Sequence, residues 1–185
     1  MSLEKYSEVR SDFREEVLLH KRNRRIELGT NAALYFEDRL TMQYQIQEML
    51  RIERIFEANG IEEELDAYNP LIPDGSNWKA TFMVEFPAAE ERRAMLRQLV
   101  DIENCVYMQV GELDRIMAIA DEDLERSDAD KTSAVHFLRF ELSSDQVAAL
   151  QDGAPLAAGI DHPNYQTEVS PVPENVRASL LADLS

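Results

Sequence analysis

The chain has 185 residues, one cysteine and a formal net charge of −17, and 44% of its residues are hydrophobic. This length and apolar content fit one ordinary domain, and a single cysteine excludes both an internal disulfide and a multi-cysteine metal site. No apolar run approaches the roughly 18 residues of a membrane span, and the first ten residues lack the apolar region of a secretion signal, so we expect a cytoplasmic protein.

The negative charge is unevenly distributed along the chain. Residues 1–60 carry a net charge of −1, and residues 61–185 carry −16. A field of this sign repels nucleic acids and anionic membranes, so we expect neither as a partner.

Residues 3–28 predict one long helix, because apolar side chains recur at helical spacing from Tyr6 onward and a glycine follows the last turn. Four cations lie near its end, where they complement the helix dipole and the acidic second half of the chain. The alternative is an anion site in which Arg22 and Arg25 bind a phosphate or carboxylate ligand.

Residues 34–56 predict a short strand followed by a second long helix, with Asp38 as the N-cap. One face of this helix carries carboxamide and guanidinium groups at steps of three or four residues. They form either a solvated face with surface ion pairs or a semi-buried network that holds a ligand or a partner. The candidate ligand-binding residues here are Arg39, Gln43, Gln47, Glu48 and Arg51.

Dense turn signals over residues 69–77 follow a further helical stretch at 57–68. We therefore divide the single domain, residues 1–185, into a helical N-terminal layer over 1–68 and a sheet-containing part over 77–185.

The second part alternates strand and helix signals. Strands are predicted at 78–86, 105–110, 115–120, 134–142 and 156–160, with helices after the first and the fourth. These two strand–helix–strand units predict an α+β fold. In it, the N-terminal long-helix layer packs on a mainly antiparallel sheet of split-βαβ, ferredoxin-like character.

The charged segment 121–131 has the carboxylate spacing of a calcium loop. However, Arg126 stands where the sharp turn of such a loop needs glycine, and Thr132 stands where the closing glutamate belongs. We therefore predict an ordinary solvated loop.

Two histidines are candidate functional residues. His136 shares a strand face with apolar residues, which favours a core or hydrogen-bonded role over a ligand role. His162 lies between Asp161 and Tyr165 in a segment predicted as a loop at a strand end, and this makes it the best acid/base or ligand candidate.

No other motif predicts chemistry. The chain has no glycine-rich phosphate loop, nucleophile elbow or His-Glu-x-x-His pair, and Cys105 reads as a buried, inert thiol. We accordingly predict no cofactor and no metal site.

Several runs resemble a bacterial family catalogued as domain of unknown function 3501: HKRNRRIELG, FEDRLTMQYQIQEMLRIERI, ELDAYNPLIPDG, KTSAVHFLRFEL and DHPNY. The resemblance covers nearly the whole chain. Its members resemble one another at Glu37, Arg39, Gln47, Glu48, Arg51, His136, Arg139 and His162. Their genes tend to lie near those of rubrerythrin-like and iron–sulfur oxidoreductase proteins, which implies a role as a partner in redox or peroxide metabolism.

The leading hypothesis is a non-enzymatic accessory protein of a cytosolic redox system, which binds an anionic ligand or a partner. It requires the polar side of the second helix to face the His162 loop. The alternative is a small metal-dependent enzyme that uses His162 and His136 with Glu37 or Glu48. A third reading is that the polar helix face joins two copies in a homodimer.

Overall fold

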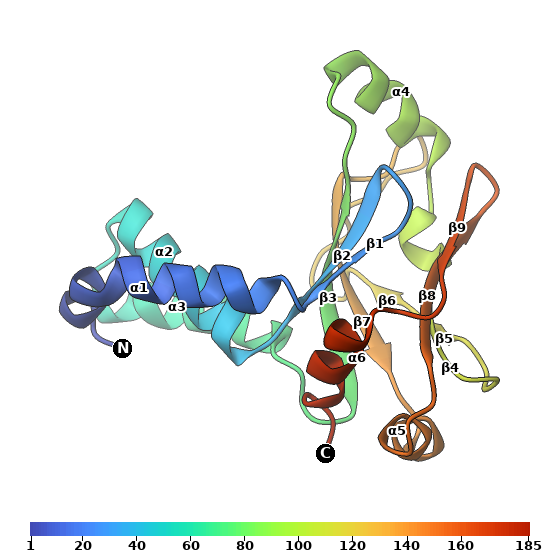
Figure 1. The fold of residues 1–185 in the computed structure, drawn as a ribbon. Helices are drawn as coiled ribbons and strands as arrows, with labels where there is room; N and C mark the ends of the chain where they lie inside the picture. The colour runs from blue at the N-terminus through green and yellow to red at the C-terminus, as the bar shows by residue number, and fades with distance from the viewer.

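The computed structural model describes residues 1–185 and consists of a helical arm attached to a body of two sheets (Figure 1). The arm projects from one side of the body. Three helices form it: α1 (Leu3–Lys21), α2 (Arg39–Glu53) and α3 (Ala58–Tyr68). A short 3-10 helix, η1 (Asn69–Leu71), follows α3 and precedes the return of the chain to the body.

The ends of α2 follow from local hydrogen bonding. The side chain of Asp38 accepts from the backbone N–H of Thr41, and the Thr41 hydroxyl accepts from the backbone N–H of Asp38. This reciprocal cap satisfies two backbone donors at the start of the helix. Arg54 ends the helix in the left-handed region with φ 57°.

The body contains two antiparallel sheets. The first has the order β1 (Arg25–Glu27), β2 (Ala32–Glu37), β3 (Asn77–Val84), β7 (Val135–Glu141), β6 (Ile119–Ala120). The second has the order β5 (Ile116–Met117), β4 (Val106–Val110), β8 (Leu156–His162), β9 (Tyr165–Val169).

The remaining helices connect or follow the strands: α4 (Ala89–Gln98), η2 (Ile102–Cys105), α5 (Ser144–Gln151) and α6 (Glu174–Leu181). Helix α4 with η2 leads from β3 to β4, and α5 leads from β7 to β8. Each connection therefore crosses from the first sheet to the second.

The main core is a cluster of 28 buried residues contributed by both sheets and by the segments that cover them. Trp78, Phe82 and Phe140 are among its largest members. No residue of α1, α2 or α3 belongs to this cluster. The arm instead buries its own apolar side chains, including Tyr6 and Met42, where α1 and α2 pack together.

Arg24 joins the arm to the body. Its guanidinium is 2% exposed and donates hydrogen bonds to the backbone oxygens of Phe36 and Glu37, both at 3.0 Å. It also donates to a carboxylate oxygen of Asp183 at 2.6 Å. This charge is thus paired and hydrogen-bonded at the root of the arm, as a buried charge requires.

The predicted α+β class and the mainly antiparallel pairing are confirmed. The two predicted strand–helix–strand units are present, but they join two sheets instead of building one. In each unit the two strands therefore do not pair with each other, because each pairs within its own sheet. No helix is both long enough and apolar enough to cross a membrane.

The prediction of one helix over residues 3–28 is wrong in its last part. Helix α1 ends at Lys21, and β1 pairs antiparallel with β2. Ile26 and Leu28 are both buried in the main core. Apolar residues two positions apart suit a strand, and this local period of two decides the structure here.

The segment 161–165 is not a loop that leaves the sheet. Strands β8 and β9 form a hairpin in which His162 pairs directly with Tyr165. The apolar signal over β9 is weak, because Gln166 and Glu168 alternate with half-buried Tyr165, Thr167 and Val169 and no residue of this edge strand is fully buried.

Candidate functional site

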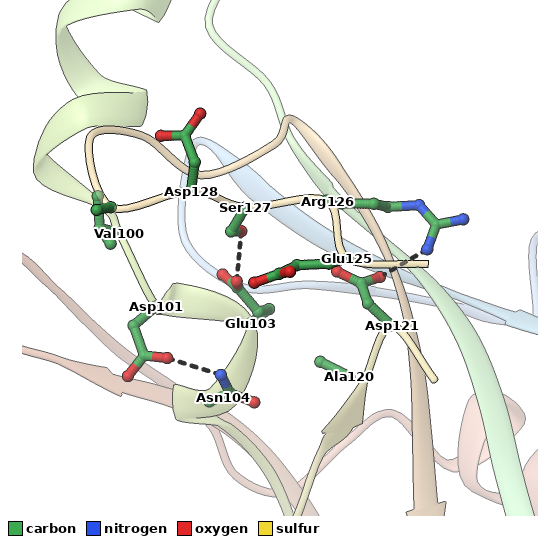
Figure 2. Close-up of a pocket in the computed structure, with 11 residues that line it drawn as sticks. Val100, Asp101, Glu103, Asn104, Ala120, Asp121, Glu125, Arg126, Ser127 and Asp128 are labelled. Atoms are coloured by element: carbon green, nitrogen blue, oxygen red, sulfur yellow. Dashed lines mark hydrogen bonds and ion pairs between the residues drawn. The ribbon is translucent and has the colours of Figure 1, made fainter. Parts of the chain in front are cut away.

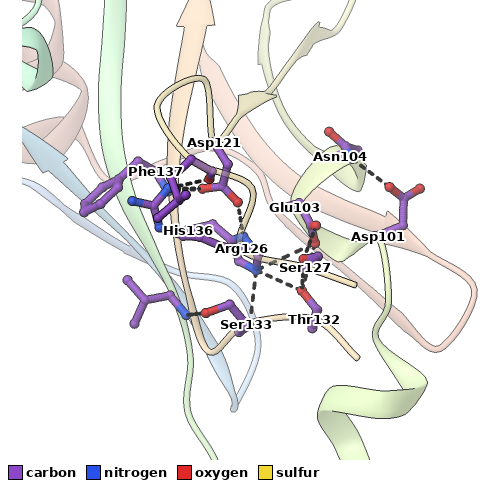
Figure 3. A network of polar contacts seen from close by, with 12 residues as sticks. Asp101, Glu103, Asn104, Asp121, Arg126, Ser127, Thr132, Ser133, His136 and Phe137 are labelled. Carbon is purple, nitrogen blue, oxygen red and sulfur yellow. Dashed lines mark hydrogen bonds and ion pairs between the residues drawn. The ribbon is translucent and has the colours of Figure 1, made fainter. Parts of the chain in front are cut away.

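A buried polar cluster lies at one edge of the first sheet, where η2 and the segment between β6 and β7 meet it (Figure 3). We define the cluster as Glu103, Asp121, Thr132 and His136. His136 is on the inward face of β7, opposite Phe82 of β3, and is fully buried. Glu103 comes from η2, and Asp121 directly follows β6 in a left-handed conformation with φ 51°.

The cluster is a continuous chain of hydrogen bonds. Nδ1 of His136 lies 2.6 Å from Oδ2 of Asp121, and Nε2 lies 2.8 Å from the Thr132 hydroxyl. The Thr132 hydroxyl in turn donates to Oε2 of Glu103 at 2.9 Å. Two carboxylates of the chain are therefore linked through one imidazole and one hydroxyl.

The segment between β6 and β7 closes over this cluster. Arg126 donates to Oδ1 of Asp121 at 3.1 Å, and its guanidinium lies 4.6 Å from the ring centroid of Phe137. The Ser127 hydroxyl donates to Oε1 of Glu103 at 2.5 Å. The prediction of a purely solvated loop is thus wrong for Asp121, Arg126 and Ser127, because they hold the segment onto the buried polar cluster.

A cavity of about 330 Å³ opens beside the cluster (Figure 2). Glu103 and Asp121 belong to both the cluster and the cavity wall. The charged residues of the wall are five carboxylates and one guanidinium: Asp101, Glu103, Asp121, Glu125, Asp128 and Arg126. The cavity therefore has a strongly negative lining that favours cations over anions.

The donor atoms of Glu103, Asp121 and His136 all lie within 4.8 Å of one another. Nε2 of His136 and Oε2 of Glu103 are 3.7 Å apart. That separation is long for a hydrogen bond but suits two ligands of one metal ion, because such ions bind imidazole and carboxylate at roughly 2.0–2.2 Å. The arrangement can hold a divalent cation with imidazole and carboxylate ligands.

A family model described as "Protein of unknown function (DUF3501)" matches residues 1–184. The chain belongs to the DUF3501 family. It is also similar to a crystal structure of a novel protein of unknown function from Burkholderia pseudomallei K96243, with a TM-score of 0.94 and 50% identity. That match covers 100% of this chain and 96% of the other. No curated protein matches.

In this DUF3501 protein, three of the residues predicted to bind a ligand lie together. Arg39, Gln43 and Gln47 line one cavity in the arm, between α2 and α3. This cavity is separate from the buried polar cluster, which lies in the body.

Glu48 and Arg51 stabilise the packing of α1 on α2. Arg10 binds both oxygens of Glu48, at 2.7 and 2.9 Å, and the Tyr6 hydroxyl donates to Oε1 at 2.5 Å. Arg51 adds a further bond at 3.0 Å. The guanidinium of Arg10, together with the other donors, lowers the pKa of Glu48 well below its usual range.

The two arginines of the predicted anion site lie in different surroundings. Arg22 directly follows α1 and lines a surface hollow along that helix together with Arg10 and Arg14. Arg25 pairs with Glu27 at 3.2 Å and lies over the ring of Tyr35.

The side chains of His162 and Tyr165 in the β8–β9 hairpin both form hydrogen bonds with backbone groups. His162 accepts the backbone N–H of Asn164 at Nδ1, and its Nε2 lies 3.0 Å from the backbone oxygen of Val100. The Tyr165 hydroxyl donates to the backbone oxygen of Leu28 at 2.7 Å. These contacts hold the β8–β9 hairpin against its neighbours.

The two remaining candidates, Arg139 and Asp161, form ion pairs on the surface. Arg139 binds Glu122 at 2.8 Å and also binds Glu141. Asp161 binds Arg115 at 3.0 Å.

The expectation that the polar side of α2 faces the His162 loop is wrong. Helix α2 is in the arm, and the β8–β9 hairpin is on the far side of the body (Figure 1). Glu37, proposed with His162 in the enzyme alternative, instead accepts hydroxyl donors from Thr41 and Thr81. The structure therefore does not gather the histidines and glutamates of that alternative into one site.

Sequence reasoning missed Glu103, Asp121 and Thr132. Thr132 and His136 are four residues apart, and Asp121 lies at a strand end, so a weak signal was available for both. Glu103 gave none, because it stands in a one-turn helix between two predicted elements.

Proposed function

We propose that this protein binds a divalent transition-metal ion in the cluster of Glu103, Asp121 and His136, with Glu103 and His136 as ligands and Asp121 positioning the imidazole, and that it acts as a binding protein, not as an enzyme. The observation that carries the proposal is the convergence of one imidazole and two carboxylates beside a negatively charged cavity. One nitrogen and several oxygen donors suit Mn²⁺, Fe²⁺ or Zn²⁺.

Metal binding would replace protons within the cluster. Both ring nitrogens of His136 face hydrogen-bond partners, and a metal ion needs a free lone pair on one of them. If Nε2 and Glu103 bind the ion, Asp121 bonds Nδ1 on the opposite side of the ring and orients the imidazole without binding the metal, which is a common arrangement around metal-bound histidines. Binding would then release a proton and fix the segment between β6 and β7.

An iron or manganese ion would give the protein a chemical connection to redox proteins. The association with rubrerythrin-like or iron–sulfur oxidoreductase proteins, which the family resemblance implies, remains a prediction, as do a cytoplasmic location and a homodimer.

The test is metal binding by the purified full-length protein. Elemental analysis after purification without chelator should find about one equivalent of a transition metal. Titration of metal-free protein with Mn²⁺ or Zn²⁺ in a calorimeter should give one site, with an enthalpy that depends on the buffer because protons are released.

Variants locate the ion. Glu103→Gln and Asp121→Asn should each weaken binding by about tenfold or more. Asp123→Asn is the matched control, because Asp123 binds Arg126 on the exposed side of the segment and contributes no donor to the cluster. Absence of stoichiometric metal, or equal affinity in the Glu103 and Asp121 variants and the parent, would refute the proposal.

A further inference from the structure

A second cavity, of about 500 Å³, lies within the helical arm. Its apolar wall is built by α2, α3 and the segment after η1, through Ile46, Leu50, Ile61, Leu65 and Ile72. Its size and mixed lining are those of small-molecule sites, which combine apolar walls with a few converging polar groups.

One polar group of this lining is buried without a partner. Gln47 is 5% exposed, and its Nε2 donates to the backbone oxygen of Met1 at 2.8 Å. The backbone oxygen of Met1 can only accept a hydrogen bond. The side-chain atom of Gln47 that contacts it must therefore be the amide nitrogen. The opposite atom, Oε1, is the one buried side-chain polar atom in the chain that lacks a hydrogen bond. Such an orphan acceptor destabilises the protein until a donor reaches it.

The other polar side chains of the lining also lack partners within the protein. Arg39 and Asn69, which are exposed, and Gln43, which is half-buried, form no side-chain hydrogen bond or ion pair within the protein. Arg39 differs in this from Arg10, Arg24 and Arg139, whose guanidinium groups all bind carboxylates. The cavity thus offers one unpaired cation and one unpaired acceptor beside an apolar wall.

We propose that the arm cavity binds a small amphipathic anion that also carries a hydroxyl or N–H group. The apolar body packs against Leu50 and Leu65, the anionic group lies beside Arg39, and the donor satisfies Oε1 of Gln47. This inference is independent of the metal site, which is in the body.

The charge of the cavity lining favours an anion over a cation at this site. Glu48 and Glu53 of α2 are absent from the lining, and Arg39 is the charged residue among its ten members. The lining itself therefore favours a negative group, although α3 carries Glu62, Glu63, Glu64 and Asp66 outside the lining and the whole chain is strongly acidic.

The test uses 1-anilinonaphthalene-8-sulfonate as the probe, since it carries a sulfonate, an N–H group and an aromatic body. Full-length parent protein should bind it saturably at one site, measured by fluorescence and calorimetry. Arg39→Gln keeps the length of the side chain without its charge and should weaken binding at least fivefold. Leu65→Trp places a larger side chain in the cavity and should abolish the saturable component.

Arg14→Gln is the matched control, because Arg14 lies on the exposed face of α1, outside the cavity. It should leave the affinity unchanged, and circular dichroism should show that each variant retains the helical content of the parent.

Three results would overturn the proposal: no saturable binding by the parent, equal binding by folded Arg39→Gln and Leu65→Trp variants, or self-association that Leu65→Trp abolishes. The last would assign the cavity to a second copy of the chain.

Discussion

Replacing Thr132 with valine removes one hydroxyl from the buried polar cluster and keeps its three ionisable members. Thr132 is 1% exposed, so the new methyl group is buried in place of the hydroxyl. The substitution deletes the donor to Oε2 of Glu103 and one of two partners of Nε2 of His136, which retains the backbone oxygen of Ser133 at 3.1 Å.

The magnitude follows from these contacts. Losing a hydrogen bond to a charged group costs about 1.5–3 kcal/mol, and burying a methyl group returns about 0.8 kcal/mol. We therefore expect a net loss of about 1.5 kcal/mol in the free energy of unfolding. For a chain of this length that corresponds to a fall in Tm of roughly 3–6 °C.

Urea denaturation of the parent and Thr132→Val proteins measures this difference directly. Ser133→Ala is the control on the same turn, where the hydroxyl accepts only from the backbone N–H of Val135, and it should change stability by less than about 1 kcal/mol. A Thr132→Val protein at least as stable as the parent, with an unchanged denaturant slope, would refute the role assigned to this hydroxyl.

Two further substitutions test the arm and its attachment. Glu48→Gln should cost about 2 kcal/mol, because it leaves the Arg10 guanidinium without its carboxylate partner. The pKa of Glu48 is lowered in the folded state, so its contribution is present above the unfolded pKa of about 4.3 and is lost as the pH falls below it. Between about pH 6 and pH 3, the urea midpoint of the variant should therefore fall less than that of the parent. An equal fall in both proteins would contradict this. Arg24→Met should cost about 3–5 kcal/mol, because it leaves the buried Asp183 carboxylate without its cation, whereas the adjacent Arg25→Met should cost less than about 1 kcal/mol. Equal denaturation midpoints for these two variants would show that Arg24 does not anchor the arm.

The sequence predicted the parts of this fold that depend on local pattern. The capped helix after Asp38 and the alternating strand that begins near Trp78 both appear in the structure within a few residues of their predicted bounds. Family membership was also predicted correctly. The strand at Ile26 was missed, because a long helical pattern precedes it and only three residues pair.

The arrangement of the candidate sites depends on contacts that the sequence does not reveal. His136 was correctly placed in the core, but its partners Glu103 and Asp121 come from segments 33 and 15 residues away in the chain. Gln43 and Gln47 were singled out for their spacing, and the cavity that they line depends on how α3 folds back onto α2. Local periodicity gives no information on either arrangement.

The separation of the arm from the main core has a consequence for motion. Because α1, α2 and α3 contribute nothing to the 28-residue cluster, we expect them to open as one unit and at a lower free energy than the sheets. Transient loosening of α3 from α2 would then admit a guest molecule without any disturbance of the sheets, and the residence time of that guest would be set by the arm alone.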